Sequence, residues 1–228
     1  MSNFISNSTN KTLQKRISEL ISFSKELKFL VGFFYFSGID ALFDTLQNNN
    51  DIPMKILVGL QADRINYQVI EYAEKNYKNT SGEKLKEKFL ESVKKSINSE
   101  EFDSEKFFKQ IQFFLNKIKD GTITIRKTIE PNHAKIYLFK LKEGQAKDTI
   151  FITGSSNFTR AGLTTQNEFN VEISDYGCKE AEEYFDNLWS DRNSIKITED
   201  EQIKKRLIEI IENETHLKKF TPFEAYVY

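Results

Sequence analysis

The sequence predicts an α/β protein folded as an α/β/α sandwich, in which helices cover both faces of a sheet. Two observations support this fold class. Apolar, β-prone runs at 27–36 and 54–60 show no polar alternation, which is typical of strands that are buried on both faces. Segments with apolar residues at helical spacing lie between these runs and after the later ones. Strands and helices therefore mix along one chain, as a layered α/β domain requires.

The first part of the chain is predicted to form helix, strand, helix and strand in that order. A strand over 27–36 is followed by a helix over 39–49 and a second strand over 54–60. The helix that precedes them covers 11–23, because its apolar residues form one stripe. These residues are Leu13, Ile17, Leu20 and Ile21.

A charged stretch from about 63 to 120 follows, and we predict that it is a helical insertion. Apolar residues recur in it at helical spacing. The basic residues within 84–96 favour a solvated helix face, with contact to a phosphate backbone as the alternative. The two apolar stripes are Leu85, Phe89, Val93 and Ile97, and Phe107, Ile111, Phe114, Leu115 and Ile118.

The second part of the chain returns to β-prone runs and ends in helical patterns. The loop 142–148 is predicted to join two strands as a hairpin. We expect all these elements to form one domain over residues 1–228. The predicted strands cover 122–128, 135–141, 149–154 and 168–174, and the predicted helices cover 178–190 and 200–213.

Composition excludes several classes of protein. The 33 basic and 34 acidic residues give a formal charge of -1, so any site for a polyanion must be local. The single cysteine, Cys178, cannot form an internal disulfide, which favours a reducing compartment. The longest apolar stretch, 29–36, is too short to span a bilayer, and no secretory signal is visible. We therefore expect a cytoplasmic protein without a membrane partner.

One of only two histidines, His133, lies two positions before Lys135 in the stretch HAKIYLFK. Residues two apart on a strand share a face, so the two side chains would point to one place. An imidazole beside an ammonium group suits an anionic ligand. A single strand histidine is more often an ordinary core or surface residue, so this interpretation depends on the rest of the sequence.

A loop rich in hydrogen-bond donors follows the strand predicted over 149–154. Gly154 permits a sharp turn, and Ser155, Ser156 and Asn157 offer hydroxyls, an amide and backbone N–H groups. Such donors hold phosphate groups. Alone, the stretch GSSN is more often an ordinary turn.

Glu168 opens the next predicted strand. Its carboxylate could orient the ring of His133 by accepting the proton of the second ring nitrogen. Alone, a glutamate at a strand end is most often solvated. The combination of HxK, GSSN and a glutamate on consecutive predicted strands is far more specific than any of its parts.

This combination resembles the HKD motif of the phospholipase D superfamily. More narrowly, it is similar to single-motif phospholipase D-like nucleases and to the similar domains at the N-terminus of bacterial helicase-like proteins. The stretches GFFYFSG at 32–38 and TPFEAY at 221–226 look like the helicase-associated subgroup. The motif positions are filled by His133, Lys135, Ser155, Asn157 and Glu168.

The sequence departs from the motif at one position. The pattern HxKxxxxD expects an aspartate where Lys140 stands. In this superfamily the aspartate is more structural than catalytic, and some nuclease members lack it. The departure therefore weakens the catalytic interpretation without removing it.

The resemblance implies a phospholipase D-like α/β/α sandwich with a mixed central sheet. It also implies a metal-independent phosphodiesterase, an endonuclease that cleaves DNA through a phosphohistidine intermediate, with no cofactor. The implied catalytic residues are His133, Lys135, Asn157 and Glu168, and the implied phosphate-binding residues are Ser155, Ser156, Lys135 and Asn157.

The resemblance also implies partners. One chain supplies only one motif, so a homodimer would complete the active site. The closest resemblance is to helicase-associated and restriction-type nucleases, which implies that this chain is the N-terminal part of a longer protein with a helicase domain. The chain itself has no Walker A sequence and so no motor of its own.

Alternatives stay open at this point. A catalytically inactive DNA-binding or dimerisation module of a helicase or restriction system is the first, and Lys140 is its best argument. A phospholipase or phosphatidyl transferase is the second, although it would usually carry two motifs and a membrane-facing surface, and neither is visible. RNA remains an alternative to DNA as the substrate.

Overall fold

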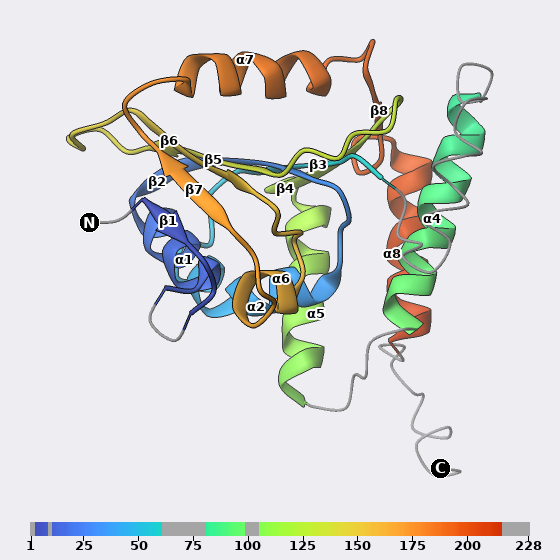
Figure 1. The fold of residues 1–228 in the computed structure, drawn as a ribbon. Helices are drawn as coiled ribbons and strands as arrows, with labels where there is room; N and C mark the ends of the chain where they lie inside the picture. Colours follow the sequence, from blue (N-terminus) through green and yellow to red (C-terminus); the bar gives the residue numbers. More distant parts are fainter. Residues whose placement is uncertain (1–2, 9–10, 61–80, 99–104, 216–228) are drawn as a thin grey trace.

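The computed structural model describes residues 3–8, 11–60, 81–98 and 105–215 (Figure 1). Over these residues, eight strands form one mixed sheet in the order β1-β7-β6-β5-β2-β3-β4-β8. β2, β3 and β4 pair in parallel, and the other neighbours pair antiparallel. The strands are β1 (Phe4–Ile5), β2 (Ser24–Val31), β3 (Met54–Val58), β4 (Ile123–Thr128), β5 (Ile136–Leu141), β6 (Thr149–Gly154), β7 (Asn170–Ile173) and β8 (Ser194–Lys196). The helices are α1 (Leu13–Phe23), α2 (Phe36–Asn48), α4 (Gly82–Asn98), α5 (Glu105–Lys119), α6 (Arg160–Thr164), α7 (Cys178–Trp189) and α8 (Glu201–Glu214).

Helices cover both faces of this sheet. Figure 1 shows α7 along one face and α1, α2, α5 and α6 on the other. The main hydrophobic cluster joins the second face to its helices and includes Ile17 of α1 and Phe114 of α5. On the first face, Leu30 and Leu57 pack against Phe185 of α7. The predicted α/β/α sandwich with a mixed central sheet is therefore confirmed.

The central strand β2 shows why its apolar residues do not alternate with polar ones. Phe29 is fully buried in the main cluster, and Leu30 is fully buried under α7. Lys28 is on the same face as Leu30, and its Nζ atom lies 2.8 Å from Asp186 of α7. Because both faces of the strand are covered, the alternating pattern of a one-sided strand is absent.

The first and the last of the described helices, α1 and α8, were both predicted, and each begins at a capping side chain. Thr12 precedes α1, and its hydroxyl accepts a hydrogen bond from the backbone N–H of Lys15. Asp200 precedes α8 and accepts from the N–H groups of Gln202 and Ile203. These side chains satisfy donors that have no partner within the helix, which fixes where each helix starts.

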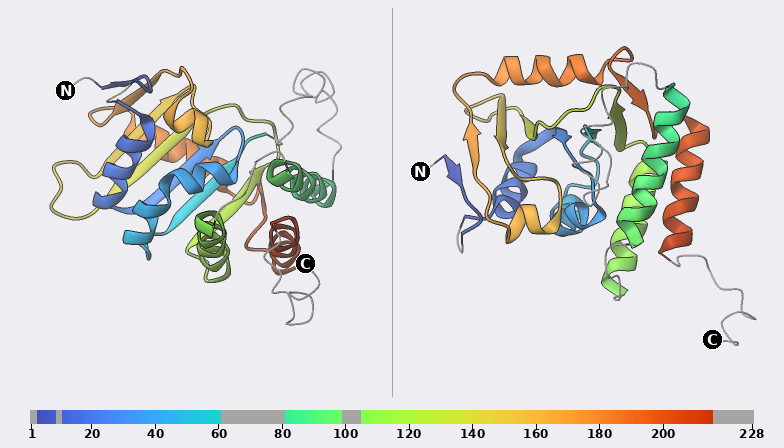
Figure 2. Two further views of the ribbon diagram at one scale, coloured as in Figure 1. Left: turned by 90° about the horizontal axis from the view of Figure 1, so that it is seen from below. Right: turned by 45° about the vertical axis from the view of Figure 1, so that its right-hand side comes forward.

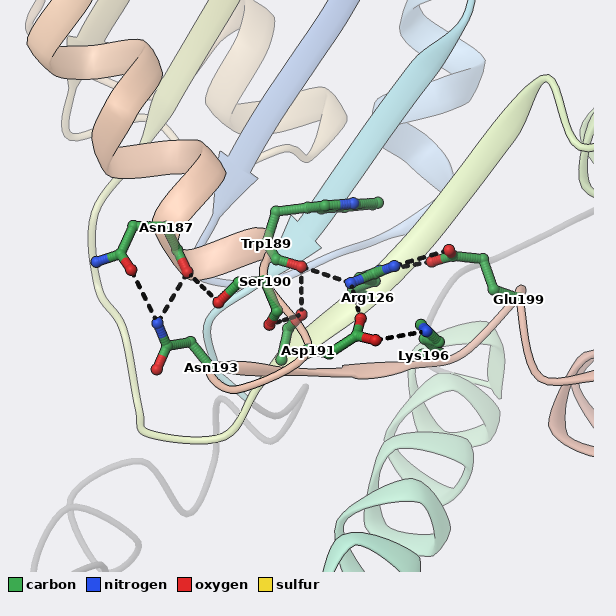
Figure 3. A network of polar contacts seen from close by, with 9 residues as sticks. Arg126, Asn187, Trp189, Ser190, Asp191, Asn193, Lys196 and Glu199 are labelled. Atoms are coloured by element: carbon green, nitrogen blue, oxygen red, sulfur yellow. Dashed lines mark hydrogen bonds and ion pairs between the residues drawn. The ribbon is translucent and has the colours of Figure 1, made fainter.

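A polar network ties β8 and the end of α7 to β4 (Figure 3). The guanidinium of Arg126 on β4 pairs with Glu199 at 2.7 Å and with Asp191 at 2.9 Å. It also lies over the ring of Trp189, 4.8 Å from the ring centroid. The Arg126 side chain is only 8% exposed. A buried cation needs such partners, so this network belongs to the framework of the fold.

Element boundaries differ from the prediction where burial continues past a strand. The strand predicted over 27–36 is β2, which ends at Val31. Phe34 and Phe36 remain buried around the turn into α2, and the Phe34 ring stacks on Phe114. The apolar run therefore contains a strand, a turn and the start of a helix. The sequence analysis also missed β1, β8 and α6, which have only 2, 3 and 5 residues.

The stretch predicted as a helical insertion, about 63 to 120, is helical at α4 and α5. Residues 61–80 and 99–104 lie outside the described residues, as does the stretch 221–226. Figure 2 shows α4 side by side with α8, and Arg206 of α8 pairs with Glu87 of α4 at 2.7 Å. Among the described helices, none is both long and apolar enough to cross a membrane.

Candidate active site

Six strand ends meet at one edge of the sheet. The parallel strands β2, β3 and β4 end there. β5 and β7 start there and β6 ends there, because β5 runs antiparallel to both β2 and β6, and β7 runs antiparallel to β6. The predicted site residues lie just outside these ends, at 133–135 before β5, at 155–157 after β6 and at 168 before β7. The topology therefore brings together residues that are far apart in the sequence.

His133 and Lys135 meet in the segment that leads into β5. The Nζ atom of Lys135 lies 3.0 Å from Nδ1 of His133 and donates to the His133 carbonyl oxygen at 2.7 Å. An ammonium group has only donors, so Nδ1 is the acceptor in this contact. Lys135 is buried at 8% exposure, whereas His133 is exposed. Both residues precede the strand, but their side chains meet as the sequence suggested.

The surroundings shift the pKa values of both groups. Burial and the charge of Lys135 lower the pKa of His133. Burial lowers the pKa of Lys135, and the nearby carboxylate of Glu168 acts in the opposite direction. A lowered pKa keeps the imidazole neutral near pH 7, and the neutral ring is the form that can attack phosphorus. The site thus combines a nucleophile with a poorly solvated cation.

Ser155 and Glu168 join two of the segments at this edge. The Ser155 hydroxyl donates to the Glu168 carboxylate and accepts from the backbone N–H of Phe169 at 3.1 Å. The backbone N–H of Ser155 donates to the Phe169 carbonyl oxygen at 3.2 Å. The sequence analysis expected Glu168 to orient the ring of His133. The structure shows its carboxylate bound to Ser155, and the expected contact with His133 stays a prediction.

Ser156 differs from the prediction, because it points into the protein. The residue is fully buried, its hydroxyl accepts from Nδ2 of Asn170 at 2.9 Å, and its N–H donates to Oδ1 of Asn170 at 3.3 Å. Its carbonyl oxygen accepts from the Tyr137 hydroxyl at 2.9 Å. Ser156 therefore anchors the loop to the interior of the protein. Its hydroxyl does not line the exposed side of the loop, as a phosphate ligand would.

Asn157 reaches the same place as Lys135 from the next loop. Its Oδ1 atom is buried, and none of the residues that the structure describes forms a hydrogen bond with it. Oδ1 of Asn157 and Nζ of Lys135 both lie close to Gly32, the first residue after β2. A buried amide oxygen without a partner is uncommon in native proteins and calls for an explanation such as a missing ligand.

Asn132 fixes the segment that carries His133, and the sequence analysis did not single it out. Its Nδ2 atom donates to the Tyr184 hydroxyl of α7 at 2.8 Å, and its Oδ1 accepts from the N–H of Ala134 at 2.9 Å. Its own N–H donates to the Gly59 carbonyl oxygen at 3.0 Å. An asparagine that caps its own turn is a recognisable local signal, but the contact with α7 is not visible in sequence.

Lys140, which replaces the motif aspartate, lies at the opposite end of β5 from His133. Its Nζ atom lies 2.7 Å from Glu182 of α7, and the same carboxylate lies 2.9 Å from Nζ of Lys28. The fold therefore accommodates the lysine with a carboxylate from α7. The side chain takes part in the attachment of that helix to the sheet.

The donor set of the site suits an anion. It comprises an imidazole, an ammonium group, an amide, a hydroxyl and one carboxylate. Within the described ranges, no group of three or more His, Cys, Asp or Glu side chains could hold a metal ion. The chemistry that these groups can perform by themselves is nucleophilic attack by the imidazole and stabilisation of negative charge by the lysine and asparagine.

Comparison with known proteins identifies the family. The family model described as "Cardiolipin synthase, PLD-like domain" matches residues 17–189, which is more than half of the chain and includes every predicted site residue. The chain therefore belongs to the PLD-like domain family of the phospholipase D superfamily, a family of phosphodiesterases and nucleases. The resemblance found in the sequence is confirmed.

Three solved structures are similar to this chain, all at low identity. Phosphatidylserine synthase of Haemophilus influenzae Rd KW20 is 14% identical, with a TM-score of 0.49 over 98% of this chain and 46% of that chain. Nuc, a phospholipase D family member from Salmonella typhimurium, is 15% identical, with a TM-score of 0.42 over 85% and 95%. NucT from Helicobacter pylori is 9% identical, with a TM-score of 0.43 over 81% and 90%.

This chain thus spans about half the length of the phosphatidylserine synthase that it matches. No curated protein sequence matches it.

Proposed function

We propose that this protein is a metal-independent nuclease that cleaves DNA through a phosphohistidine intermediate on His133. The observation that supports it best is the meeting of His133, Lys135 and Asn157 at one edge of the sheet, with an imidazole of lowered pKa beside a buried ammonium group. Family membership supports phosphodiester chemistry. DNA is favoured over a phospholipid by the resemblance of the motif to single-motif nucleases.

The reaction proceeds in two displacements. Nδ1 of the neutral His133 ring, freed when the ammonium group of Lys135 turns to the phosphoryl oxygens, attacks phosphorus, a P–N bond forms, and the P–O bond to the leaving strand breaks. A second imidazole, which takes up a proton when the anionic substrate binds beside it, protonates the leaving oxygen. Water then attacks phosphorus, gives up a proton to that same imidazole, and the P–N bond breaks. The ammonium group of Lys135 and the amide of Asn157 stabilise the charge that builds on the phosphoryl oxygens.

The second imidazole comes from another copy of the chain. One chain supplies one motif, so we propose a homodimer whose two-fold axis brings two copies of His133 together. In a longer protein, this domain would be the N-terminal part that serves an attached helicase, as the stretch 32–38 suggests by its resemblance to the helicase-associated subgroup.

The experiment is a cleavage assay in excess EDTA with single-stranded DNA, double-stranded DNA and RNA, run beside His133→Ala. We expect cleavage of DNA that survives chelation and disappears in the variant. Cleavage that stops on chelation, or that persists in His133→Ala, would contradict the proposed chemistry. Vesicles of phosphatidylglycerol in a parallel assay test the phospholipid alternative, which hydrolysis or transfer on the vesicles alone would support.

A second candidate is a catalytically inactive module that still binds DNA or dimerises. It is favoured by Lys140 in place of the motif aspartate and by the engagement of Glu168 with Ser155. Tight binding of DNA by the wild-type protein, without any cleavage, is the result that would select it.

A further inference from the structure

Gly32 is the first residue after β2 and lies at the edge where the site forms. A Cβ atom at this position would stand 2.9 Å from Oδ1 of Asn157 and 3.6 Å from Nζ of Lys135. It would also stand 3.6 Å from Cδ1 of Leu60. The side chains of three segments, from the ends of β3, β5 and β6, thus converge on the space that the missing methyl group leaves open.

Gly32 differs from the other glycines near the site. At Gly59, Gly154 and Gly162, an added Cβ would run into a backbone carbonyl oxygen, so the fold itself requires glycine there. The three atoms around Gly32 are all side-chain ends, which can move, and its φ lies outside the left-handed region that favours glycine. The fold can therefore accept alanine at position 32, and the added methyl group would act on the side chains of Asn157 and Lys135 rather than on the backbone.

A second observation points to a ligand in the same space. Oδ1 of Asn157 is buried and has no hydrogen-bond partner among the described residues. The oxygen and nitrogen of an amide can exchange places by a flip, so either end can face the gap. With its NH2 end turned toward the gap, Asn157 would donate to an oxygen that also receives a hydrogen bond from Lys135. A phosphoryl oxygen has the required charge and acceptor geometry.

We propose that Gly32 is a positioning residue of the active site. Its missing side chain keeps Asn157 and Lys135 at the separation that a phosphoryl group needs, so that both can donate to it. This inference rests on the proposed function, because it places the phosphoryl group of the substrate beside this gap, in contact with Asn157 and Lys135. It adds a residue from the stretch GFFYFSG, which lies outside the HxK and GSSN parts of the motif.

The test is Gly32→Ala, with Gly82→Ala as the matched control. A Cβ at Gly82 would have Ile195 as its nearest neighbour at 3.9 Å, so this variant adds the same methyl group without crowding. We expect Gly32→Ala to lower kcat by about tenfold to a hundredfold, because small displacements of catalytic groups are costly. We also expect weaker inhibition by orthovanadate and by inorganic phosphate. Gly82→Ala should leave both measurements unchanged.

A double-variant comparison separates positioning from a general loss of structure. Removal of the Asn157 side chain removes the closest contact of the new methyl group. On an Asn157→Ala background, Gly32→Ala should therefore cost much less activity than it costs in the wild type. If Gly32→Ala alone lowers the melting temperature, Asn157→Ala should restore it.

The outcomes are distinct. Wild-type cleavage together with full activity of Gly32→Ala would overturn this inference and leave the proposed function standing. If Gly32→Ala lost the same activity in the wild type and in Asn157→Ala, the inference would also be overturned, since the effect would not depend on the contact with Asn157. A wild-type protein that neither cleaves DNA nor binds orthovanadate would overturn the proposed function and this inference together.

Discussion

The ammonium group of Lys135 acts on the candidate site in two ways. It lies 3.0 Å from Nδ1 of His133, where its charge disfavours protonation of the ring. It also borders the gap next to Asn157, where a phosphoryl group would carry negative charge. Because Lys135 is buried, its charge is screened less by water than a surface charge would be. In the proposed reaction, a single side chain would thus prepare the nucleophile and stabilise the transition state.

Replacement of Lys135 by methionine tests the first of these effects. The pKa of His133 is lowered by burial and by Lys135, so loss of the charge should raise it, although burial will still hold it below its ordinary value. The acid limb of the pH profile of any remaining activity should move to higher pH, because more of the ring is protonated at a given pH. Proton NMR titration of the histidine rings measures the shift.

The chain has only two histidines, so the spectrum is simple, and His133→Ala assigns the signals. Lys142→Met, which removes an exposed lysine, is the matched control and should leave the titration of His133 unchanged. A pKa of His133 that stays constant or falls in Lys135→Met would show that the two groups are not coupled as the contact implies.

At this scale, residue types and spacing predicted much of the site. His133 and Lys135 were expected to meet because residues two apart on a strand share a face. They do meet, although both lie before β5 begins. The orientation of Ser156 could not be predicted, because it depends on Asn170. That residue begins β7, the strand that follows the loop and pairs with β6. Gly32 could not be predicted either, since its neighbours come from three separate segments.

Among the helices, α7 has a special relation to the site, because it holds both ends of β5. Near the start of the strand, Tyr184 bonds Asn132, next to His133. Near its end, Glu182 pairs with Lys140. Between these points, Phe185 packs under the sheet in a cluster with Leu30 and Leu57. The helix that covers this face thus also fixes where the segment that carries His133 begins.

Tyr184→Phe should loosen the segment that carries His133. The change removes one hydrogen bond of 2.8 Å between partly exposed groups, and such a bond contributes about 0.5–1.5 kcal/mol. We expect kcat to fall by roughly threefold to tenfold with little change in KM, and the free energy of unfolding to fall by no more than the contribution of this one hydrogen bond. Steady-state kinetics measures this. Tyr176→Phe, which alters a tyrosine that is 75% exposed, is the control and should behave as wild type.

Equal kcat values for Tyr184→Phe and Tyr176→Phe would show that the site does not depend on the Tyr184 hydroxyl. A large loss of stability in Tyr184→Phe would instead mean that the hydroxyl matters to the fold as a whole.

Lys140→Asp restores the residue that the motif expects, and we predict that it does not restore function. The new carboxylate would face Glu182, which now pairs with Lys140 at 2.7 Å. Repulsion should make Lys140→Asp less stable than Lys140→Met by about 1 kcal/mol, a modest amount because both side chains are partly exposed. Urea unfolding measures the difference. Increased cleavage by Lys140→Asp would show that the lysine suppresses activity and would favour the inactive module.

Elements with long patterns were predicted well, and those with short ones were not. The strand predicted over 149–154 is β6 itself, and the helix predicted over 178–190 is α7 with one residue more. β1 and β8 have too few residues to show a period, and their pairing with β7 and β4 is decided by tertiary contacts. The strand predicted over 27–36 extends too far at its end, because burial of apolar residues continues past Val31, where β2 ends.

At the scale of the whole molecule, the single motif predicts that activity requires two chains. Specific activity should fall when the protein is diluted below the concentration at which it dimerises, and sedimentation velocity should show the same transition. A large excess of His133→Ala mixed with wild type should suppress cleavage, because most wild-type chains would then pair with a chain that lacks the second imidazole.

An excess of Tyr176→Phe is the matched control, since mixed dimers with this variant keep both histidines. Activity that is independent of dilution and insensitive to His133→Ala would mean that one chain contains a complete site, and sedimentation as a monomer would agree with it.

The order of strands in the sheet also governs how the protein can fold. β5 pairs with β2 across more than a hundred residues of chain, and β1 at the start pairs with β7 near the end. Pairings of such long range form late, because the entropy of closing large loops is lost before their contacts form. A chain that has regained its helices but not these pairings still keeps His133 apart from Gly32. A partly folded chain is therefore harmless to the DNA that the folded protein is proposed to cut.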